Sequence, residues 1–386
     1  MTQKQIALVG STGSIGVQTL EIVTEYPDRF RVHLLAAGHN VNLLIEQALR
    51  FKPDIAIIAD TDLYGTLHEA LSPHGIRTAA GSAALADAME EEPYDLAVIA
   101  TVGYSGLEPT LRAIKANRSI ALANKETLVV AGELVTSRLK ESKSTILPID
   151  SEHSAIYQSL AGEDRNDIKR LLITASGGPF RNKSREELCH VTVKDALNHP
   201  NWAMGAKITI DSATMLNKAF EIIEARWLFD VPQSKIQAVV HPQSIVHSMV
   251  EFVDGAVKAQ LGVPDMRIPI SYALGNTCRL ATERRGLSIS DYAHLEFFEP
   301  DTERFPLLNL AYHALDRGGN VACVINAANE IAVAAFLHER IRFTDIQHLI
   351  ESSLEKMPYI PNPSYEDYVA TNSETRRYAE SIITTL

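Results

Sequence analysis

The stretch that most constrains the fold is GSTGSIG, residues 10–16. It follows QIALV, an apolar run typical of a buried strand, and leads into residues 14–27, which have the pattern of an amphipathic helix. Glycines at such a turn permit positive φ angles and let the backbone approach a pyrophosphate at the helix N-terminus. The spacing is G-x-x-G-x-x-G rather than G-x-G-x-x-G. We predict a nucleotide-binding turn that opens a parallel sheet; an ordinary glycine-rich turn is the alternative.

The first 150 residues repeat this alternation of strand and helix, which is typical of a Rossmann-like α/β domain. Beyond it, a second α/β domain is expected over 151–280. Its expected elements are strands at 171–178 and 206–211, a long helix at 211–229, and a hairpin over 244–262 with a two-residue Asp254-Gly255 turn. Residues 281–305 are predicted to be a linker. Residues 306–386 are predicted to form a helical bundle, in which one helix starts at a Thr344 cap and stops before Pro358.

Composition excludes several classes of protein. Lys and Arg number 36 against 48 Asp and Glu, and the resulting net charge of −12 argues against a nucleic-acid binder. The three cysteines, Cys189, Cys278 and Cys323, are scattered and indicate neither a disulfide framework nor a cysteine metal site. No apolar run reaches the length of a membrane span, and no signal-peptide pattern precedes Ile6. A cytoplasmic protein without membrane partners is expected.

The end of the second expected strand indicates which nucleotide binds. NAD-binding domains usually place Asp or Glu there, where the carboxylate holds the ribose 2′-hydroxyl. Here the strand ends in Gly38, His39 and Asn40, which leave room and donors for a 2′-phosphate. NADP(H) is therefore predicted.

Two carboxylates follow the strand at residues 144–150. If the extended geometry continues, Asp150 and Glu152 point to the same side. Asn217, Lys218 and Glu221 share one face of a later helix. Three converging carboxylates would require a cation, and hard oxygen ligands select Mg²⁺ or Mn²⁺. The alternative is a solvated loop end and a surface charge.

Other groups suit a phosphate. Ser176 precedes two glycines at a strand end, and Ser212 is expected at a helix N-terminus, where an anion is favoured. His199, Asn217 and Lys218 add further donors. Taken singly, Ser212 could be only a helix cap and His199 only a loop residue.

The loop HPNWAMG, residues 199–205, contains a tryptophan, a residue that usually enters a core. A lid that closes over a substrate and excludes water would account for Trp202 and Met204. Packing of Trp202 against the domain surface is the alternative.

Together these motifs resemble the 1-deoxy-D-xylulose 5-phosphate reductoisomerase family. The likeness rests on GSTGSIG, LANKET, PIDSEHSAI, ITASGGPF, HPNWAMG, IDSATMLNKAFEIIEA, HPQSIVHSMVEF and INAANEIAVAAFL, which span essentially the whole chain. The resemblance implies conversion of that phosphorylated sugar to 2-C-methyl-D-erythritol 4-phosphate for isoprenoid precursors. It also implies NADPH, Mg²⁺ or Mn²⁺, and a homodimer that pairs through the sheet of the second domain.

The resemblance also implies residue roles. The pyrophosphate turn would be Thr12, Gly13, Ser14 and Ile15. Further cofactor contacts would be Gly38, His39, Asn40, Asn124, Glu126 and Gly205. The metal ligands would be Asp150, Glu152 and Glu221. Lys125 and Ser151, with Glu152 and Glu221, would hold the reacting end of the substrate, and Ser176, His199, Ser212, Asn217 and Lys218 its phosphate. Lys125 and the three carboxylates would be the catalytic groups.

One position departs from the family, because many members have Lys or Arg where this chain has His39. A histidine is neutral at higher pH, so the preference for NADP over NAD is the property most affected. Two other functions are considered: a plain NADP-dependent dehydrogenase, such as one resembling aspartate-semialdehyde dehydrogenase, and a non-catalytic nucleotide sensor. The dehydrogenase would need a cysteine nucleophile at a helix start, and none of the three cysteines has that setting.

Overall fold

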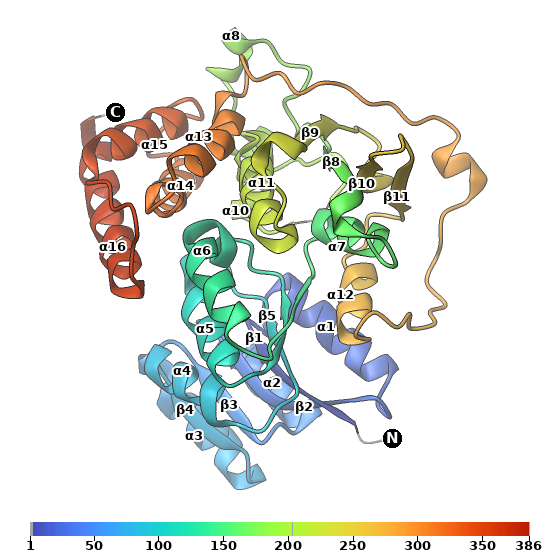
Figure 1. Ribbon diagram of the computed structural model, residues 1–386. Coiled ribbons are helices and arrows are strands. Elements are labelled where there is room, and N and C mark those ends of the chain that lie inside the picture. The colour runs from blue at the N-terminus through green and yellow to red at the C-terminus, as the bar shows by residue number, and fades with distance from the viewer. Residues whose placement is uncertain (1–2, 203, 386) are drawn as a thin grey trace. The chain divides into compact units, whose positions relative to one another are not determined.

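The computed structural model describes residues 3–202 and 204–385 (Figure 1). Its contacts divide the chain into two compact units. Unit 1 comprises Met1–Thr127, Val135–Ser154 and Asp265–Glu283, and unit 2 comprises Leu128–Leu134, Ala155–Pro264 and Arg284–Leu386. Among the described residues, no helix is both long and apolar enough to cross a membrane.

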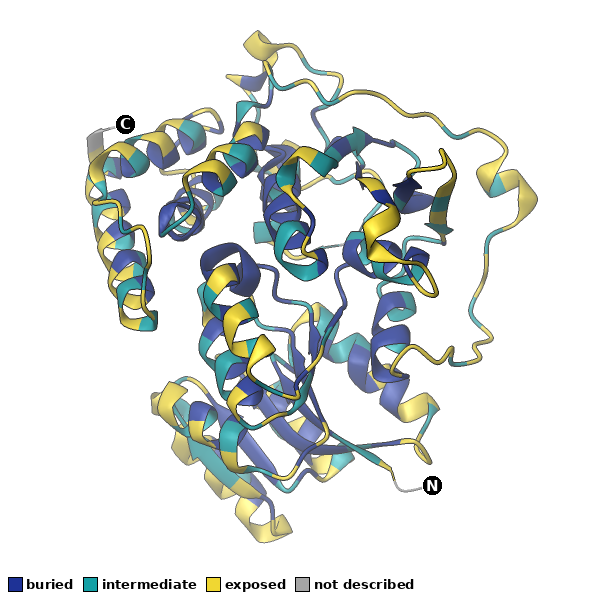
Figure 2. Ribbon diagram, in the orientation of Figure 1, coloured by how far each residue is buried: buried dark blue, intermediate teal, exposed yellow. Residues whose placement is uncertain are grey.

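Unit 1 contains a seven-stranded parallel sheet in the order β4-β3-β2-β1-β5-β6-β7. Its strands are β1 (Lys4–Val9), β2 (Phe30–Ala37), β3 (Ile55–Ile58), β4 (Arg77–Ala80), β5 (Leu96–Ile99), β6 (Ser119–Leu122) and β7 (Ile146–Pro148). The central strands are apolar without alternation because both faces of the sheet are covered, and Ile6 to Val9 are buried throughout (Figure 2). This confirms the predicted Rossmann-like sheet.

Helices connect the strands of unit 1. They are α1 (Ser14–Glu25), α2 (Val41–Phe51), α3 (Tyr64–Leu71), α4 (Ser82–Glu91), α5 (Leu107–Lys115), α6 (Glu126–Lys140), α7 (Ser151–Ser159) and α12 (Arg267–Leu274). The middle of α6 and the end of α7 belong to unit 2. The strand order reverses at β1, which lies between β2 and β5. Ligands of doubly wound sheets bind at such a reversal, outside the carboxyl ends of the strands.

Unit 2 contains a mixed sheet in the order β11-β10-β8-β9, in which only β8 and β9 are parallel. Its strands are β8 (Ile168–Ala175), β9 (Ile236–Val240), β10 (Val246–Phe252) and β11 (Val257–Leu261). The edge strand β11 alternates exposed and half-buried residues (Figure 2). The helices that follow β8 are α8 (Arg185–Leu188), α9 (Val193–Ala196), α10 (Ala206–Ala213) and α11 (Leu216–Phe229).

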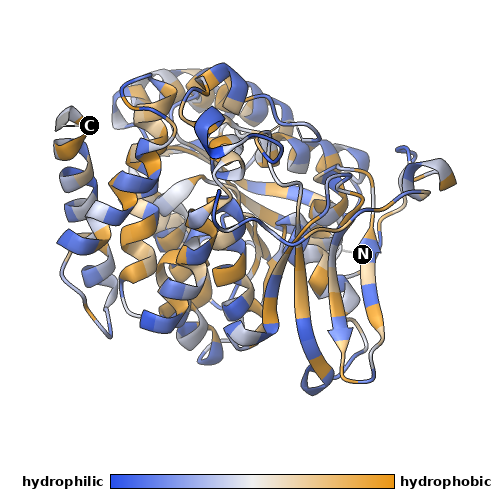
Figure 3. Cartoon of the chain, turned by 90° about the horizontal axis from the view of Figure 1, so that it is seen from above, coloured by the Kyte–Doolittle hydropathy of each residue, from blue (hydrophilic) through white to orange (hydrophobic). Residues whose placement is uncertain are grey.

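The C-terminal part of unit 2 is helical, as predicted. It consists of α13 (Leu310–Arg317), α14 (Val321–Leu337), α15 (Asp345–Lys356) and α16 (Tyr365–Ile382). These helices mix hydrophobic and hydrophilic residues along their turns (Figure 3), and their apolar residues share one continuous buried cluster with those of α10 and α11. Alanines on α14 leave space for close helix packing. The segment before α13 has little regular structure apart from 3₁₀ turns at Ile289–Tyr292 and Pro306–Asn309.

Local predictions in unit 2 were partly wrong. Residues 206–211 form part of helix α10 rather than a strand. The predicted long helix is broken at Met215, which adopts a left-handed conformation with φ 63° between α10 and α11. The hairpin loop is longer than two residues, because Phe252 donates its N–H to Ala256 and Gly255 (φ 89°) donates back to Phe252. Thr344 lies at the N-cap of α15, but its side chain makes no capping hydrogen bond among the described residues.

Candidate active site

The turn after β1 is shaped by two glycines that nothing larger could replace. Gly10 has φ 91°, and a Cβ there would lie 2.5 Å from the carbonyl oxygen of Ala100. A Cβ on Gly16 would lie 2.3 Å from the carbonyl oxygen of Gly10. Gly13 is the N-cap of α1, and no described side chain caps that helix. The first N–H groups of α1 are therefore suited to an anion.

The end of β2 has a feature that sequence reasoning missed. The His39 side chain is 85% exposed, and its Nδ1 lies 3.0 Å from a carboxylate oxygen of Asp60, which follows β3. This hydrogen bond and one from the Asp62 backbone N–H lower the pKa of Asp60. An acid therefore stands beside the predicted 2′-phosphate position after all. The available signal was its place at the end of the neighbouring strand, since carboxyl ends of parallel strands share one edge.

Asn124 has a structural task at the end of β6. Its buried amide nitrogen donates to the carbonyl oxygens of Thr101 (2.9 Å) and Gly103 (2.8 Å). Its amide oxygen accepts the backbone N–H and the hydroxyl of Thr127. Asn124 therefore ties the loop after β5 to the start of α6, and Glu126 lies in the first turn of that helix.

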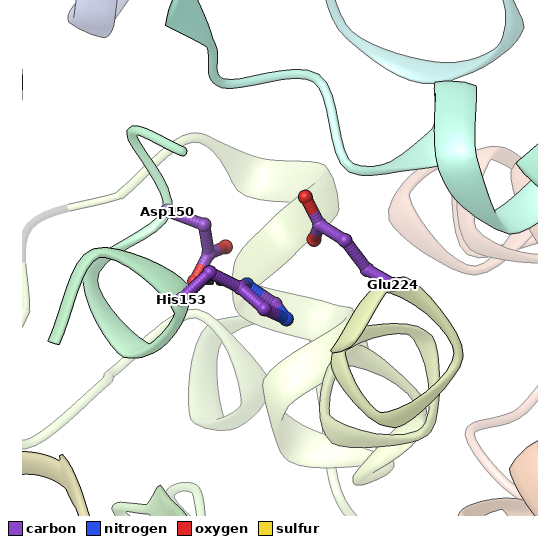
Figure 4. A group of neighbouring side chains, drawn as sticks. All are labelled: Asp150, His153 and Glu224. Atoms are coloured by element: carbon purple, nitrogen blue, oxygen red, sulfur yellow. Dashed lines mark ion pairs between the residues drawn. The ribbon is translucent and has the colours of Figure 1, made fainter. Parts of the chain in front are cut away.

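Lys125 and Asp150 form a buried ion pair in unit 1, with Nζ 2.6 Å from Oδ2. His153, on the first turn of α7, has its Nδ1 3.4 Å from the other oxygen of Asp150. The two side chains lie next to each other at this corner of the chain (Figure 4). Burial alone would raise the pKa of Asp150, but the charge of Lys125 and the hydrogen bond and charge of His153 outweigh it and hold that pKa well below its usual range. The carboxylate is ionised at neutral pH.

Glu152 lies beside Asp150 in a different geometry from the one predicted. Because α7 begins at Ser151, the chain is not extended between the two carboxylates. The Ser151 hydroxyl donates to Glu152 at 2.6 Å, and the backbone N–H of Glu152 lies 3.3 Å from Asp150 Oδ1. The strand-to-helix corner thus groups three oxygen-bearing side chains.

In unit 2, Asn217, Lys218 and Glu221 share one face of α11, as the spacing predicts. Glu221 is buried and accepts hydrogen bonds from the Asn217 amide and the Lys218 ammonium. Burial of a carboxylate is costly unless it is paired and hydrogen-bonded, and both conditions hold here.

Ser176 and His199 meet in the same unit, with the serine Oγ 3.0 Å from Nε2. Nδ1 of His199 accepts the backbone N–H groups of Asn201 (3.3 Å) and Trp202 (3.0 Å). The neutral ring therefore has its proton on Nε2 and donates to Ser176. Burial lowers the pKa of His199, which favours this neutral form. The backbone N–H of Gly178 also donates to Ser176.

Ser212 does not lie where the sequence suggested. It is near the C-terminal end of α10 rather than at a helix N-terminus, so no helix dipole at that position favours an anion. Its neighbourhood is instead the left-handed corner at Met215 that leads into α11. Gly205 is the N-cap of α10.

Trp202 is half-buried and packs near the ring of His247, with the centroids 5.9 Å apart. This contact with β10 corresponds to the packed alternative, and sequence reasoning did not identify His247. Met204 is half-buried, and residue 203 of this loop lies outside the described residues.

Three family models match the chain. The model described as 1-deoxy-D-xylulose 5-phosphate reductoisomerase covers residues 6–132, and the model of that enzyme's C-terminal domain covers residues 146–229. A model described as DXP reductoisomerase C-terminal domain covers residues 261–378.

Relatives match over the full length. The 1-deoxy-D-xylulose 5-phosphate reductoisomerases of Bacteroides fragilis and Porphyromonas gingivalis are each 52% identical over 381 residues, covering 99% of this chain and 98% of theirs. The Zymomonas mobilis enzyme, solved with NADPH, has 43% identity and a TM-score of 0.92, with 100% of both chains covered. A DOX-P reductoisomerase solved with NADPH, fosmidomycin and magnesium has 40% identity, a TM-score of 0.94, and 99% and 98% coverage. The chain belongs to the 1-deoxy-D-xylulose 5-phosphate reductoisomerase family.

Proposed function

We propose that this chain rearranges 1-deoxy-D-xylulose 5-phosphate and reduces it to 2-C-methyl-D-erythritol 4-phosphate, with NADPH as reductant and Mg²⁺ or Mn²⁺ as metal. The observation that supports this best is identity of 52% over nearly the whole length to reductoisomerases of that name. Solved relatives bind NADPH and magnesium, and both groups suit the donor sets of this chain.

The turn after β1 fits the cofactor. Two glycines that tolerate no side chain bring the backbone close to the N-terminus of α1, where Thr12, Gly13, Ser14 and Ile15 would hold the pyrophosphate. Gly38, His39 and Asn40 would face the 2′-phosphate. Asn124, Glu126 and Gly205 would lie toward the nicotinamide, with Asn124 acting by holding its loops in place.

Asp150, Glu152 and Glu221 would be the ligands of the divalent cation. All three offer carboxylate oxygens, and two of them are already balanced by a lysine ammonium within their own unit. When bound, NADPH supplies a hydride, and the divalent ion supplies Lewis acidity toward a carbonyl oxygen.

The chain's own residues bind and orient the substrate. Ser151 and Lys125 would hold its reacting end, where the Lys125 ammonium stabilises the negative charge that develops on oxygen. Ser176, His199, Ser212, Asn217 and Lys218 would bind the phosphate. Because Ser176 accepts from both His199 and Gly178, its own hydroxyl proton is directed elsewhere and can be donated to a phosphate oxygen.

The phosphate group lies far from the carbons that react. The free energy of binding it can therefore drive closure of the loop of residues 199–205, which would exclude water from the reaction. Trp202 and Met204 would form that lid. The structure corrects one premise of the comparison with the dehydrogenase, because Cys323 does lie at a helix start, in the first turn of α14. That alternative is still not favoured, because Cys323 is buried and burial raises the pKa of its thiol, which opposes formation of a thiolate nucleophile.

A homodimer in the cytoplasm is proposed as well. The exposed apolar residues Val253, Val257 and Leu261 at the β10–β11 hairpin suit pairing between two copies. All three cysteines are free, which suits a reducing compartment.

The direct test is to mix the protein with NADPH, Mn²⁺ and 1-deoxy-D-xylulose 5-phosphate, to follow cofactor oxidation at 340 nm, and to identify the product by NMR. We expect oxidation that depends on the metal and a product with a branched carbon skeleton. Oxidation without rearrangement would support the plain dehydrogenase. Unchanged substrate would refute the assignment.

A further inference from the structure

The helix α14 contains a motif to which the proposed reaction gives no role. INAANE, residues 325–330, places Asn326 and Asn329 in an alanine-rich helix whose remaining residues are apolar apart from Glu330, and neither asparagine side chain is exposed. A buried amide is stable only when its polar atoms find partners. The partners of these amides therefore indicate what the motif does.

Asn329 is bonded to helix α10. Its amide nitrogen donates to Asp211 Oδ1 at 2.8 Å, and both side chains are buried. Asp211 Oδ2 in turn lies 2.7 Å from the ammonium of Lys207, one turn earlier on α10. The amide oxygen of Asn329 accepts no hydrogen bond from the described residues, so the contact with Asp211 is the one that stabilises this amide.

Asp211 directly precedes Ser212, which is one of the proposed phosphate ligands. Successive side chains of a helix point about 100° apart, so a bond that fixes the direction of Asp211 also fixes that of Ser212. The other side of this helix end is fixed as well. Gly178 has φ 69°, and a Cβ there would lie 2.7 Å from the carbonyl oxygen of Ser212.

The same helix end determines where α11 begins. Met215 donates its N–H to the carbonyl of Ser212 at 3.2 Å and then turns the chain with a left-handed φ. Asn217 and Lys218 follow within three residues. A rotation of α10 would therefore displace three proposed phosphate ligands together.

We propose that Asn329 is a positioning residue for the phosphate end of the substrate, which it holds through Asp211. The inference rests on the proposed function for the identity of the phosphate ligands. Asn329 does not touch the substrate; it sets the orientation of α10, and thereby that of Ser212, Asn217 and Lys218.

The test compares Asn329→Leu with Asn320→Leu. Asn320 is a second buried asparagine, at the N-cap of α14, and it bonds to Pro358, Ile360 and Thr371 rather than to α10. Each variant loses a buried amide from the same helix, so both are expected to lower the melting temperature. Only Asn329→Leu is expected to raise the KM for the phosphorylated substrate and the Kd for inorganic phosphate, by about tenfold each. The KM for NADPH should change less than about twofold in both.

The isosteric variant Asp211→Asn supplies a second measurement if Asn329→Leu does not fold. We expect it to weaken phosphate binding by about threefold to tenfold, because an uncharged acceptor holds the amide less firmly. Asn329→Asp would place two buried carboxylates together, so it should weaken phosphate binding more than Asn329→Leu does. The exchanged pair Asp211→Asn with Asn329→Asp restores one donor and one carboxylate, and phosphate affinity should recover to within about threefold of the wild type.

Several results would overturn the proposal. One is an unchanged Kd for phosphate in Asn329→Leu, or in Asp211→Asn, with only the melting temperature lowered. Equal loss of phosphate affinity in Asn320→Leu would show a general packing effect instead. The proposed function fails separately, if the wild type leaves the substrate unchanged. The phosphate titrations then still decide the role of Asn329, and a wild type that binds no phosphate would refute it.

Discussion

The turn after β1 in unit 1 and the group around Ser176 and α11 in unit 2 are both suited to anions, but they use different parts of the chain. The turn relies on backbone: glycines that tolerate no Cβ and the N-terminus of α1. The unit 2 group relies on side chains from the turn after β8, from the loop at residues 199–205, and from α10 and α11. A backbone site depends on a few consecutive residues. A side-chain site depends on many elements packing correctly.

The largest loss of activity is expected when a charged residue of the side-chain site in unit 2 is replaced. Glu221→Gln removes a buried negative charge that accepts bonds from Asn217 and Lys218 and would hold the metal. We expect kcat/KM to fall by at least about 100-fold, because a metal ion contributes several kcal/mol to such a reaction and each 1.36 kcal/mol is worth about tenfold. NADPH affinity, measured by fluorescence titration, should be unchanged.

The matched control is Glu251→Gln, on β10 of the same unit, where the carboxylate pairs with Lys169 and Arg170 away from all proposed ligands. Its kcat/KM should stay within about twofold of the wild type. Near-normal turnover of Glu221→Gln would show that Glu221 is not a metal ligand.

The next effect tests the backbone site. Gly16→Ala places a Cβ 2.3 Å from a carbonyl oxygen of the turn, so the turn has to open. We expect the Kd for NADPH to rise at least about tenfold and the melting temperature to fall, since crowding of this kind typically costs about 1–3 kcal/mol. Gly65→Ala in α3 is the control, because a Cβ there meets no atom within 4 Å. Equal NADPH affinities for the two variants would contradict the close-packed turn.

A smaller effect is expected from His39, whose side chain would face the 2′-phosphate beside this backbone site. His39→Asp replaces a cation-capable ring with an acid beside Asp60 and should repel a 2′-phosphate. The ratio of kcat/KM for NADPH over NADH should fall about tenfold. Asp60→Asn should move the ratio modestly the other way. If His39→Asp leaves the ratio unchanged, another residue recognises the phosphate.

The last effect is on folding stability rather than on binding or turnover, and it concerns how pH acts on unit 2. His247 is buried on β10 under Trp202, and burial lowers its pKa to about 4 from 6.5. The unfolded chain therefore takes up a proton below pH 6.5 that the folded chain refuses until pH about 4, so stability falls as pH falls through this window. His247→Gln should lose less stability than the wild type between pH 7 and pH 4 in urea titrations. The control His190→Gln changes an exposed histidine in the same unit and should keep the wild-type slope.

The contrast between a site built from backbone and a site built from side chains also explains which features could be predicted from the sequence. The glycine turn after β1 is a local pattern, and both this turn and the parallel sheet follow from the alternation of apolar strands and amphipathic helices along the chain. The shared face of Asn217, Lys218 and Glu221 followed from helical geometry. The pattern of α10 misled, because Ile208, Thr209 and Ile210 are β-branched and favour a strand. Thr209, Ile210 and Asp211 are buried within unit 2, and this burial overrides the local preference for a strand.

Contacts between residues that are far apart in the sequence could not be predicted. Asp60 meets His39 across two neighbouring strands, and Asn329 meets Asp211 across more than a hundred positions. Each partner alone looks ordinary: an acid in a loop, and an asparagine in an alanine-rich helix. Only the tertiary arrangement gives them their partners.

The segment Asp265–Glu283 has a consequence for how the protein is made. It rejoins unit 1 after the chain has built the sheet of unit 2, and its helix α12 packs against α1 and near β6 and β7. The Lys4 ammonium donates to the carbonyl of Leu274 at the end of α12. During synthesis, unit 1 is therefore completed only when residues 265–283 have left the ribosome, long after its last strand β7. A polypeptide that ends at residue 154 would leave α1 without this neighbour, so a complete unit 1 requires residues 265–283 as well as the N-terminal segment.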